Sequence, residues 1–183
     1  MKNIKTIKNG IILALVLSIL FTSTAFGIEN LEERSSAYLL GDFDTGRILE
    51  GYNIDKPMEI ASITKLMTYL VVMEEIDKKN INFDDTVMIS EKVSEVKGSS
   101  LNLKKGEILT IEQLLDGLLI VSANDAAVAL AEYVMGSEEN FVHRMNQKAK
   151  EIGLDSAKFV NATGLPKGEE QNKMSPVDIF NLS

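Results

Sequence analysis

Residues 62–76 constrain the fold more than any other stretch, because a long apolar run begins there immediately after a serine and a lysine. The apolar residues that follow Lys65 predict a helix buried in a hydrophobic core. Ser62 and Lys65 stand three residues apart, close to one helical turn, so their side chains project from the same face of that helix. A serine hydroxyl is a weak nucleophile until a neighbouring base takes its proton, and a lysine can do this if burial keeps part of it neutral. The pair is therefore a candidate nucleophile and general base in a Ser-x-x-Lys pattern.

The same pattern occurs a second time, in Ser94 and Lys97. Charged residues surround this second copy just before Gly98, which predicts a short helix exposed to solvent. Only the first copy lies where a core would desolvate its lysine. The alternative for the first copy is purely structural, with Ser62 as a helix cap and Lys65 as a surface charge.

Residues 1–27 have the pattern of a secretory signal peptide. Three lysines precede the apolar run 10–21, small residues follow it, and cleavage is expected after Gly27. The alternative is a retained membrane anchor, but the apolar run falls short of the roughly 20 residues that cross a bilayer core. We therefore expect an exported protein.

Residues 28–183 are acidic and contain no cysteine. Without the three lysines of the signal peptide the formal net charge of −8 becomes −11, which disfavours nucleic acid as a partner. The absence of cysteine excludes a disulfide framework, thiol catalysis and a lipid-modified cysteine anchor. His143 is the single histidine, so a multi-histidine zinc site is excluded too, and we expect this residue on a helix surface.

The remaining pattern predicts one domain of short strands and helices. A β-hairpin is expected from residues 36–51, with turn chemistry at 42–46. A short strand is expected at 86–89. Capping signals and helical spacing predict further helices that begin near Thr110, Ala126, Ser137 and Ser175, and Gly153 is expected to end the third of these.

A Ser-x-Asn triplet is the second chemical signal, and it also occurs twice. Ser122 and Asn124 lie in a break between two apolar helices, whereas Ser100 and Asn102 lie in an extended, lysine-flanked segment. A break between helices can point a hydroxyl and an amide into a cleft, the hydroxyl to relay a proton and the amide to hold a substrate peptide group. The structural alternative is that Ser122 and Asn124 cap the alanine-rich helix.

Taken together, these segments resemble the low-molecular-mass penicillin-binding proteins, serine D-alanyl-D-alanine carboxypeptidases of peptidase family S11. The resemblance covers most of the chain after the signal peptide and favours Ser62 over Ser94 and Ser122 over Ser100. It implies an α+β fold of the β-lactamase/DD-peptidase (transpeptidase-like) type, with a helical subdomain and part of a central antiparallel sheet. The family's landmarks occur in order at residues 38–46, 61–68, 98–100, 114–132 and 161–166.

The resemblance also implies a role for each candidate residue. Ser62 would attack the carbonyl of the penultimate D-alanine of a peptidoglycan stem peptide and form an acyl-enzyme, with Lys65 as the base. Ser122 would relay a proton to the departing D-alanine, and Asn124 would hold the substrate backbone until water releases the acyl group. β-Lactams would acylate Ser62 as substrate mimics. No cofactor or metal is implied, and the site of action would be the extracytoplasmic face of the membrane or the cell wall.

One family motif is missing from this sequence. After the Ser-x-x-Lys and Ser-x-Asn motifs, the family carries a third motif, Lys-Thr-Gly or a close variant. In the family this motif lies on a strand that provides an oxyanion-hole amide and positive charge for the substrate carboxylate. Residues 162–164 have the threonine and glycine without the lysine, and residues 172–175 stand where relatives usually carry a histidine-containing run. We therefore expect residues 28–183 to be the N-terminal portion of the catalytic domain, without its later strands, and to be weakly active or inactive alone. Membrane association is expected only through a missing C-terminal segment.

Two other functions remain open at this point. A related Ser-x-x-Lys enzyme such as a class A β-lactamase would need a glutamate-bearing loop to activate the deacylating water, and the sequence offers Glu169 and Glu170 only in a polar stretch. A non-catalytic cell-wall binding protein on the same scaffold would bind stem peptides reversibly.

Overall fold

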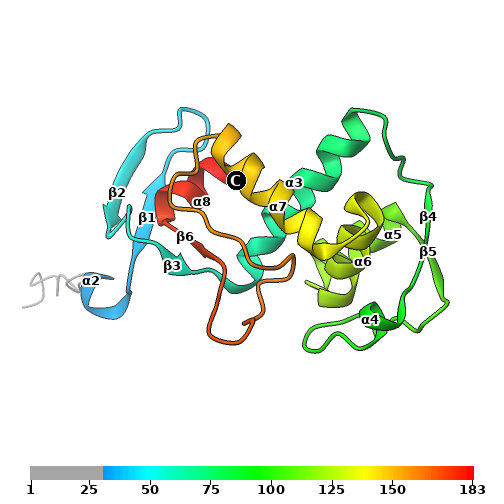
Figure 1. Cartoon of the computed structure of the whole chain (residues 1–183). Coiled ribbons are helices and arrows are strands. Elements are labelled where there is room, and N and C mark those ends of the chain that lie inside the picture. The colour runs from blue at the N-terminus through cyan, green and yellow to red at the C-terminus, as the bar shows by residue number, and fades with distance from the viewer. Residues whose placement is uncertain (1–30) are drawn as a thin grey trace, which may run out of the picture. The chain divides into compact units, whose positions relative to one another are not determined.

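The computed structural model describes residues 31–183 (Figure 1). The chain divides into two units between residues 36 and 37. Helix α2, Leu31–Arg34, belongs to the first unit, and the predicted signal peptide lies outside the described residues. Within residues 31–183, no helix is long and apolar enough to cross a membrane.

The second unit, residues 37–183, has an α+β fold, as expected. Its strands form three antiparallel pairs, β1 with β2, β3 with β6 and β4 with β5. The strands are β1 Tyr38–Gly41, β2 Ile48–Tyr52, β3 Met58–Glu59, β4 Thr86–Met88, β5 Ile108–Thr110 and β6 Lys173–Met174. The helices are the 3-10 helix η1 Ala61–Ile63 and the α-helices α3 Thr64–Asp77, α4 Glu91–Ser94, α5 Ile111–Ile120, α6 Asn124–Met135, α7 Glu138–Glu151 and α8 Pro176–Leu182.

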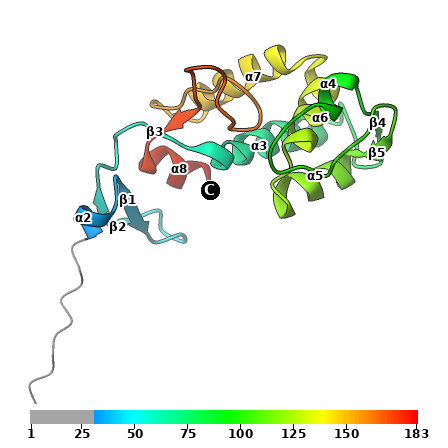
Figure 2. The same ribbon diagram turned by 90° about the horizontal axis from the view of Figure 1, so that it is seen from below.

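Helix α3 is the central element of the core. It contacts α5, α6 and α7, and Figure 2 shows these helices around it. Met67, Val71 and Val72 are fully buried on α3, which confirms the predicted burial of this helix. Each such side chain contributes about 1.5–3 kcal/mol through the apolar surface that it removes from water. The core therefore fixes the helix that begins just after Ser62.

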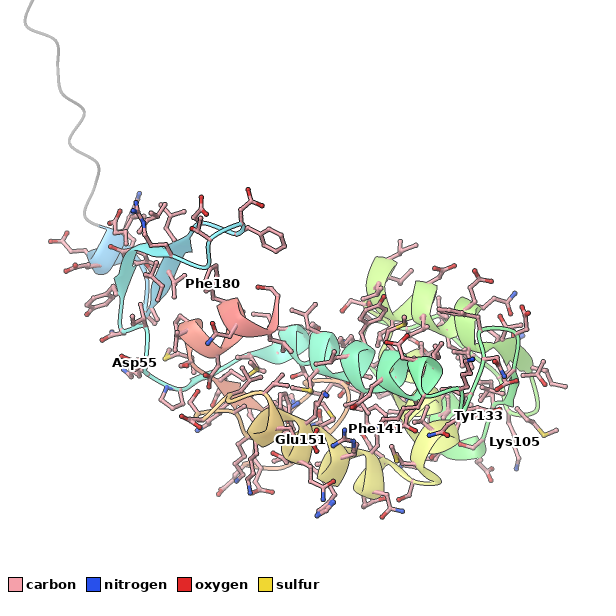
Figure 3. All side chains as sticks on the ribbon, turned by 90° about the horizontal axis from the view of Figure 1, so that it is seen from above. Asp55, Lys105, Tyr133, Phe141, Glu151 and Phe180 are labelled. Atoms are coloured by element: carbon pink, nitrogen blue, oxygen red, sulfur yellow. The ribbon has the colours of Figure 1, made fainter. Side chains whose placement is uncertain are left out.

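Ion pairs add a second connection between α3 and α7. Glu74 on α3 accepts hydrogen bonds from Arg144 at 2.5 Å and Lys148 at 3.0 Å, both on α7. Burial alone would raise the pKa of Glu74, but the hydrogen bonds and charges of Lys148 and Arg144 outweigh it and lower the pKa to about 2. Glu151, labelled at the end of α7 in Figure 3, completes the cluster with a 2.8 Å bond from Arg144.

The helix boundaries follow their capping signals. Thr110 and Gln113 form the predicted capping box at the start of α5, with hydrogen bonds of 3.2 and 2.9 Å. Ser137 caps α7 and Ser175 caps α8, each through a 3.2 Å bond from a backbone N–H. Gly153 follows α7 with a φ of +74°, the left-handed conformation that commonly ends a helix.

The predicted hairpin is confirmed as β1 and β2, with Tyr38 opposite Tyr52. Phe180 of α8 packs against it, because a Cβ on Gly41 would lie 2.5 Å from the Phe180 ring (Figure 3). His143 is exposed on α7, as expected. Strand β5, which pairs with β4, has no counterpart in the sequence-based prediction.

Candidate active site

The α-helix begins at Thr64, two residues later than the sequence predicts, and Ser62 lies in the preceding 3-10 helix η1. The hydroxyl of Ser62 caps neither helix, so the cap alternative is wrong. Ala61, directly before it, has a φ of +42°, an unfavourable conformation for a residue with a Cβ. Ser62 is exposed on this strained turn, where a ligand from solvent can reach it.

Lys65 is buried, with 3% of its surface exposed, so it is not the surface charge of the structural alternative. Its amine donates hydrogen bonds to Asn124 Oδ1 at 2.8 Å, to the Thr163 carbonyl at 3.0 Å and to Ser62 Oγ at 3.2 Å. Burial lowers the pKa of Lys65 from its ordinary value of 10.5 to about 8. About one tenth of the amine is therefore neutral at pH 7, and about half at pH 8.

The arrangement of acceptors around Lys65 orients its lone pair. A neutral amine has two N–H groups and one lone pair, arranged tetrahedrally. The two shorter contacts, to Asn124 and Thr163, take the two N–H groups. The lone pair then points toward the remaining neighbour, the hydroxyl of Ser62, and can accept its proton.

Asn124 is the first residue of α6, and its side chain caps no helix. It is buried and forms a bridge, since its Oδ1 accepts from Lys65 and its Nδ2 donates to the Lys97 carbonyl at 2.9 Å. Gly98 packs closely against this amide, because a Cβ there would lie 2.7 Å from Nδ2. Lys97, the lysine of the second Ser-x-x-Lys copy, therefore contacts Asn124 through its backbone carbonyl and not through its side-chain amine.

The loop of residues 161–164 packs beside Lys65, and its Thr163 carbonyl accepts a hydrogen bond from the Lys65 amine. Asn161 Oδ1 accepts from the N–H groups of Thr163 at 3.1 Å and Gly164 at 2.7 Å, which fixes the direction of the Thr163 carbonyl. Thr68 on α3 donates to the Ala162 carbonyl at 2.8 Å. A Cβ on Gly164 would overlap the Ala61 carbonyl oxygen, so the two backbones are in direct contact. The loop therefore contacts both Lys65 and the turn that carries Ser62.

Comparison with known proteins assigns the chain to a family. The model of peptidase family S11, described as D-alanyl-D-alanine carboxypeptidase, matches residues 24–183. The chain belongs to this family. It is 44% identical over 151 residues to the D-alanyl-D-alanine carboxypeptidase DacF of Bacillus subtilis, a match that covers 82% of this chain and 38% of the relative. The chain thus spans about two fifths of that relative's length.

Solved structures of similar proteins have the same fold. The D-alanyl-D-alanine carboxypeptidase DacD of Francisella tularensis superposes with a TM-score of 0.76 at 38% identity, over 80% of this chain and 35% of that chain. Penicillin-Binding Protein D2 of Listeria monocytogenes, in its ampicillin-bound form, superposes with a TM-score of 0.68 at 30% identity, over 80% of this chain and 57% of that chain. Both likenesses confirm the expected DD-peptidase fold.

In this member of the D-alanyl-D-alanine carboxypeptidase family, Ser122 occupies a strained junction between α5 and α6. Its φ is +58°, and it is half-buried. Ser62, Lys65 and Asn124 are joined by hydrogen bonds, whereas no hydrogen bond joins the Ser122 hydroxyl to any of the three. The structure therefore does not link the Ser122 hydroxyl to the other three candidate residues.

Asp125 is a residue that sequence reasoning missed. It is buried and accepts from the hydroxyl of Ser100 at 2.5 Å and from the N–H groups of Leu101 and Leu103, both at 3.1 Å. Burial would raise the pKa of Asp125, but the hydrogen bonds from Ser100 and the backbone lower it. The second Ser-x-Asn copy thus anchors the loop that holds Asn124. Among residues 31–183, no cluster of His, Asp or Glu could hold a metal ion.

Proposed function

We propose that the chain carries the nucleophile and the base of a serine D-Ala-D-Ala carboxypeptidase that acts on peptidoglycan stem peptides. The observation that carries this proposal is the buried amine of Lys65, whose pKa is about 8 and which lies 3.2 Å from the Ser62 hydroxyl. Membership of the D-alanyl-D-alanine carboxypeptidase family supplies the substrate class.

In the first step Ser62 Oγ attacks the carbonyl carbon of the penultimate D-alanine while its proton moves to Lys65. The C–N bond then breaks, the acyl group stays on Ser62, and D-alanine leaves after its nitrogen receives a proton through Ser122. Asn124 uses one amide N–H on the Lys97 carbonyl, which leaves the other to hold the substrate backbone. Water then hydrolyses the ester.

We propose that β-lactams acylate Ser62 as mimics of this substrate. The similar Listeria monocytogenes protein, solved in an ampicillin-bound form, supports this proposal. The signal-peptide pattern of residues 1–27 supports export, and with it a role on the extracytoplasmic side of the membrane, in the periplasm or cell wall. The reaction needs no nucleic acid and no cofactor.

Acylation by these 183 residues is expected to be slow, because residues 28–183 contain no Lys-Thr-Gly sequence. By family resemblance that motif provides part of the oxyanion hole, and the loss of a single oxyanion donor typically costs about 10²–10³ in rate. Rapid labelling of every molecule by a fluorescent penicillin would contradict this expectation.

The rate of acylation should rise with pH through a midpoint of about 8. The sign follows from the role of Lys65, because only its neutral form accepts the Ser62 proton and this form increases as pH passes its pKa of about 8. The initial rate of β-lactam adduct formation between pH 6 and 9.5, corrected for spontaneous hydrolysis of the β-lactam, measures the midpoint. A rate that is flat across this range would exclude Lys65 as the base.

Release of D-alanine tests the reaction itself. A synthetic stem peptide ending in D-Ala-D-Ala should lose its terminal residue slowly, whereas the same peptide ending in L-alanine should remain intact. β-Lactam turnover without D-alanine release would instead favour the β-lactamase alternative. Reversible binding of the peptide with no adduct on Ser62 would favour a binding protein.

The site geometry gives no support to the β-lactamase alternative. Glu169 and Glu170 are exposed, and Glu170 pairs with Lys158 at 3.2 Å on the surface. Neither glutamate forms a hydrogen bond with Ser62 or Lys65, which are the groups that a deacylating water would have to approach.

A further inference from the structure

Asn172 is a buried amide whose hydrogen-bonding capacity is filled. It is 1% exposed. Its Nδ2 donates to Thr64 Oγ1 at 2.8 Å and to the Asn161 carbonyl at 3.0 Å. Its Oδ1 accepts from the N–H groups of Val160 at 2.7 Å and Asn161 at 3.3 Å. Because an asparagine side chain has two donors and two principal acceptor positions, every one of them has a partner.

These bonds attach Asn172 to both sides of the turn that carries Ser62. Before the turn, the N–H of Ile60 donates to the Asn172 carbonyl at 3.2 Å. After the turn, Thr64 accepts from the Asn172 side chain. The turn between them contains Ala61 with its φ of +42°, a conformation that costs about 1–3 kcal/mol and persists only where the surroundings hold it.

The Asn172 amide also holds the 161–164 loop beside Lys65. Through the backbone of Asn161 it fixes the start of the loop whose Thr163 carbonyl accepts from the Lys65 amine. Asn172 thus connects the turn of Ser62 to the loop that orients Lys65, although it forms no hydrogen bond with either side chain.

We propose that Asn172 is a positioning residue for acylation, which holds the Ser62 turn against the 161–164 loop and keeps water away from the Lys65 amine. The effect on acylation rests on the proposed function, whereas the effect on Lys65 rests on the geometry alone. Loss of the Asn172 amide releases the loop, admits water to the amine, and relieves the desolvation that lowers the Lys65 pKa.

Asn146 offers a matched control. Its Nδ2 donates to the carbonyls of Val142 and Phe159, both at 2.9 Å, and its Oδ1 accepts from the Phe159 N–H at 3.0 Å. It therefore bridges α7 to Phe159, just before the 161–164 loop, and forms no hydrogen bond with α3. If Asn172 served only the stability of the fold, its replacement by alanine would affect the Lys65 amine no more than the replacement of Asn146 does.

The test is to measure the pKa of Lys65 by NMR titration of chains labelled at the lysine side chains. In Asn172→Ala we expect this pKa to rise from about 8 toward 10.5, by about one unit or more, because water reaches the amine. In Asn146→Ala it should stay near 8, although both variants lose stability. The rate of Ser62 acylation should fall about tenfold or more in Asn172→Ala only.

Thr64 supplies a milder pair of variants in case Asn172→Ala does not fold. Thr64→Val removes the acceptor on α3 and leaves the other Asn172 bonds in place, so the Lys65 pKa should rise by less, while Thr64→Ser keeps the hydroxyl and should keep the pKa near 8. An unchanged pKa in folded Asn172→Ala and Thr64→Val, or an equal rise in Asn146→Ala, would overturn the proposal. Absence of acylation in the unmodified chain, with these pKa shifts observed, would count against the proposed function and leave the positioning role intact.

Discussion

Replacing Lys65 with methionine is expected to slow the acylation of Ser62 by a β-lactam by roughly 10²–10⁴-fold, the usual contribution of a general base. Methionine has a similar length but cannot accept the Ser62 proton. It also leaves Asn124 Oδ1 and the Thr163 carbonyl without their donor. The measurement is the rate of adduct formation at pH 8.5, where most Lys65 is neutral in the unmodified chain.

Lys97→Met is the matched control for this prediction. Lys97 reaches the site through its backbone carbonyl, which the substitution keeps, and it is exposed. Its acylation rate should stay within about twofold of the unmodified chain, since surface substitutions have small effects. Equal rates for Lys65→Met and the unmodified chain, with both folded, would show that Lys65 is not the base.

Replacing Gly164 with alanine is expected to damage both the fold and the site. Its φ of +88° penalises any Cβ by about 1–2 kcal/mol, and overlap of that Cβ with the Ala61 carbonyl oxygen adds about 1–3 kcal/mol of overpacking. Because Ala61 precedes Ser62, relief of the overlap must move the nucleophile turn or the 161–164 loop. Acylation should then fall roughly 10²-fold, as expected for a displacement near 1 Å.

Gly168→Ala separates the clash from the backbone penalty. Gly168 lies in the same segment with a φ of +64°, but a Cβ there meets no atom within 4 Å. Urea unfolding should show a loss of only about 1–2 kcal/mol for Gly168→Ala, with acylation unchanged. Similar unfolding free energies and similar acylation rates for the two variants would mean that the contact between Gly164 and Ala61 does not hold the site together.

The local chemistry of the site could be predicted from the sequence. The three-residue spacing of Ser62 and Lys65, followed by an apolar run, predicts both their proximity and the burial of the lysine, and the structure shows both. The position of Asn124 in a break between apolar helices predicts an inward-facing amide, which the structure also shows. The start of the helix was wrong by two residues, because Ser62 lies in a 3-10 turn that Ala61 enters with a positive φ.

The long-range partners could not be predicted in the same way. Lys65 meets the Thr163 carbonyl 98 positions along the chain, and Thr64 meets Asn172 at a separation of 108. A backbone carbonyl has no residue-type signal, and a buried asparagine in a polar stretch is indistinguishable from a surface one until the chain is folded. By family resemblance, residues 172–175 stand where relatives usually carry a histidine-containing run, and this departure is the one sequence signal at Asn172.

Ser100 illustrates how a motif can match in the wrong place. Its Ser-x-Asn pattern duplicates that of Ser122, but its hydroxyl is bound to the carboxylate of Asp125. That bond, with the N–H groups of Leu101 and Leu103, fixes the loop whose Lys97 carbonyl holds Asn124. Ser100 of the second Ser-x-Asn copy therefore helps to hold Asn124 of the first copy in place. This role becomes visible only in the folded structure, where α6 packs against the loop.

Mass spectrometry of the chain after incubation with a penicillin tests the central claim most directly. We expect an adduct that accumulates slowly and adds the mass of one β-lactam to a fraction of the chains. Digestion should locate it on the peptide that contains Ser62, and it should be absent from Ser62→Ala. An adduct that persists in Ser62→Ala, or one that digestion locates on a peptide without Ser62, would contradict the assignment of Ser62 as the nucleophile.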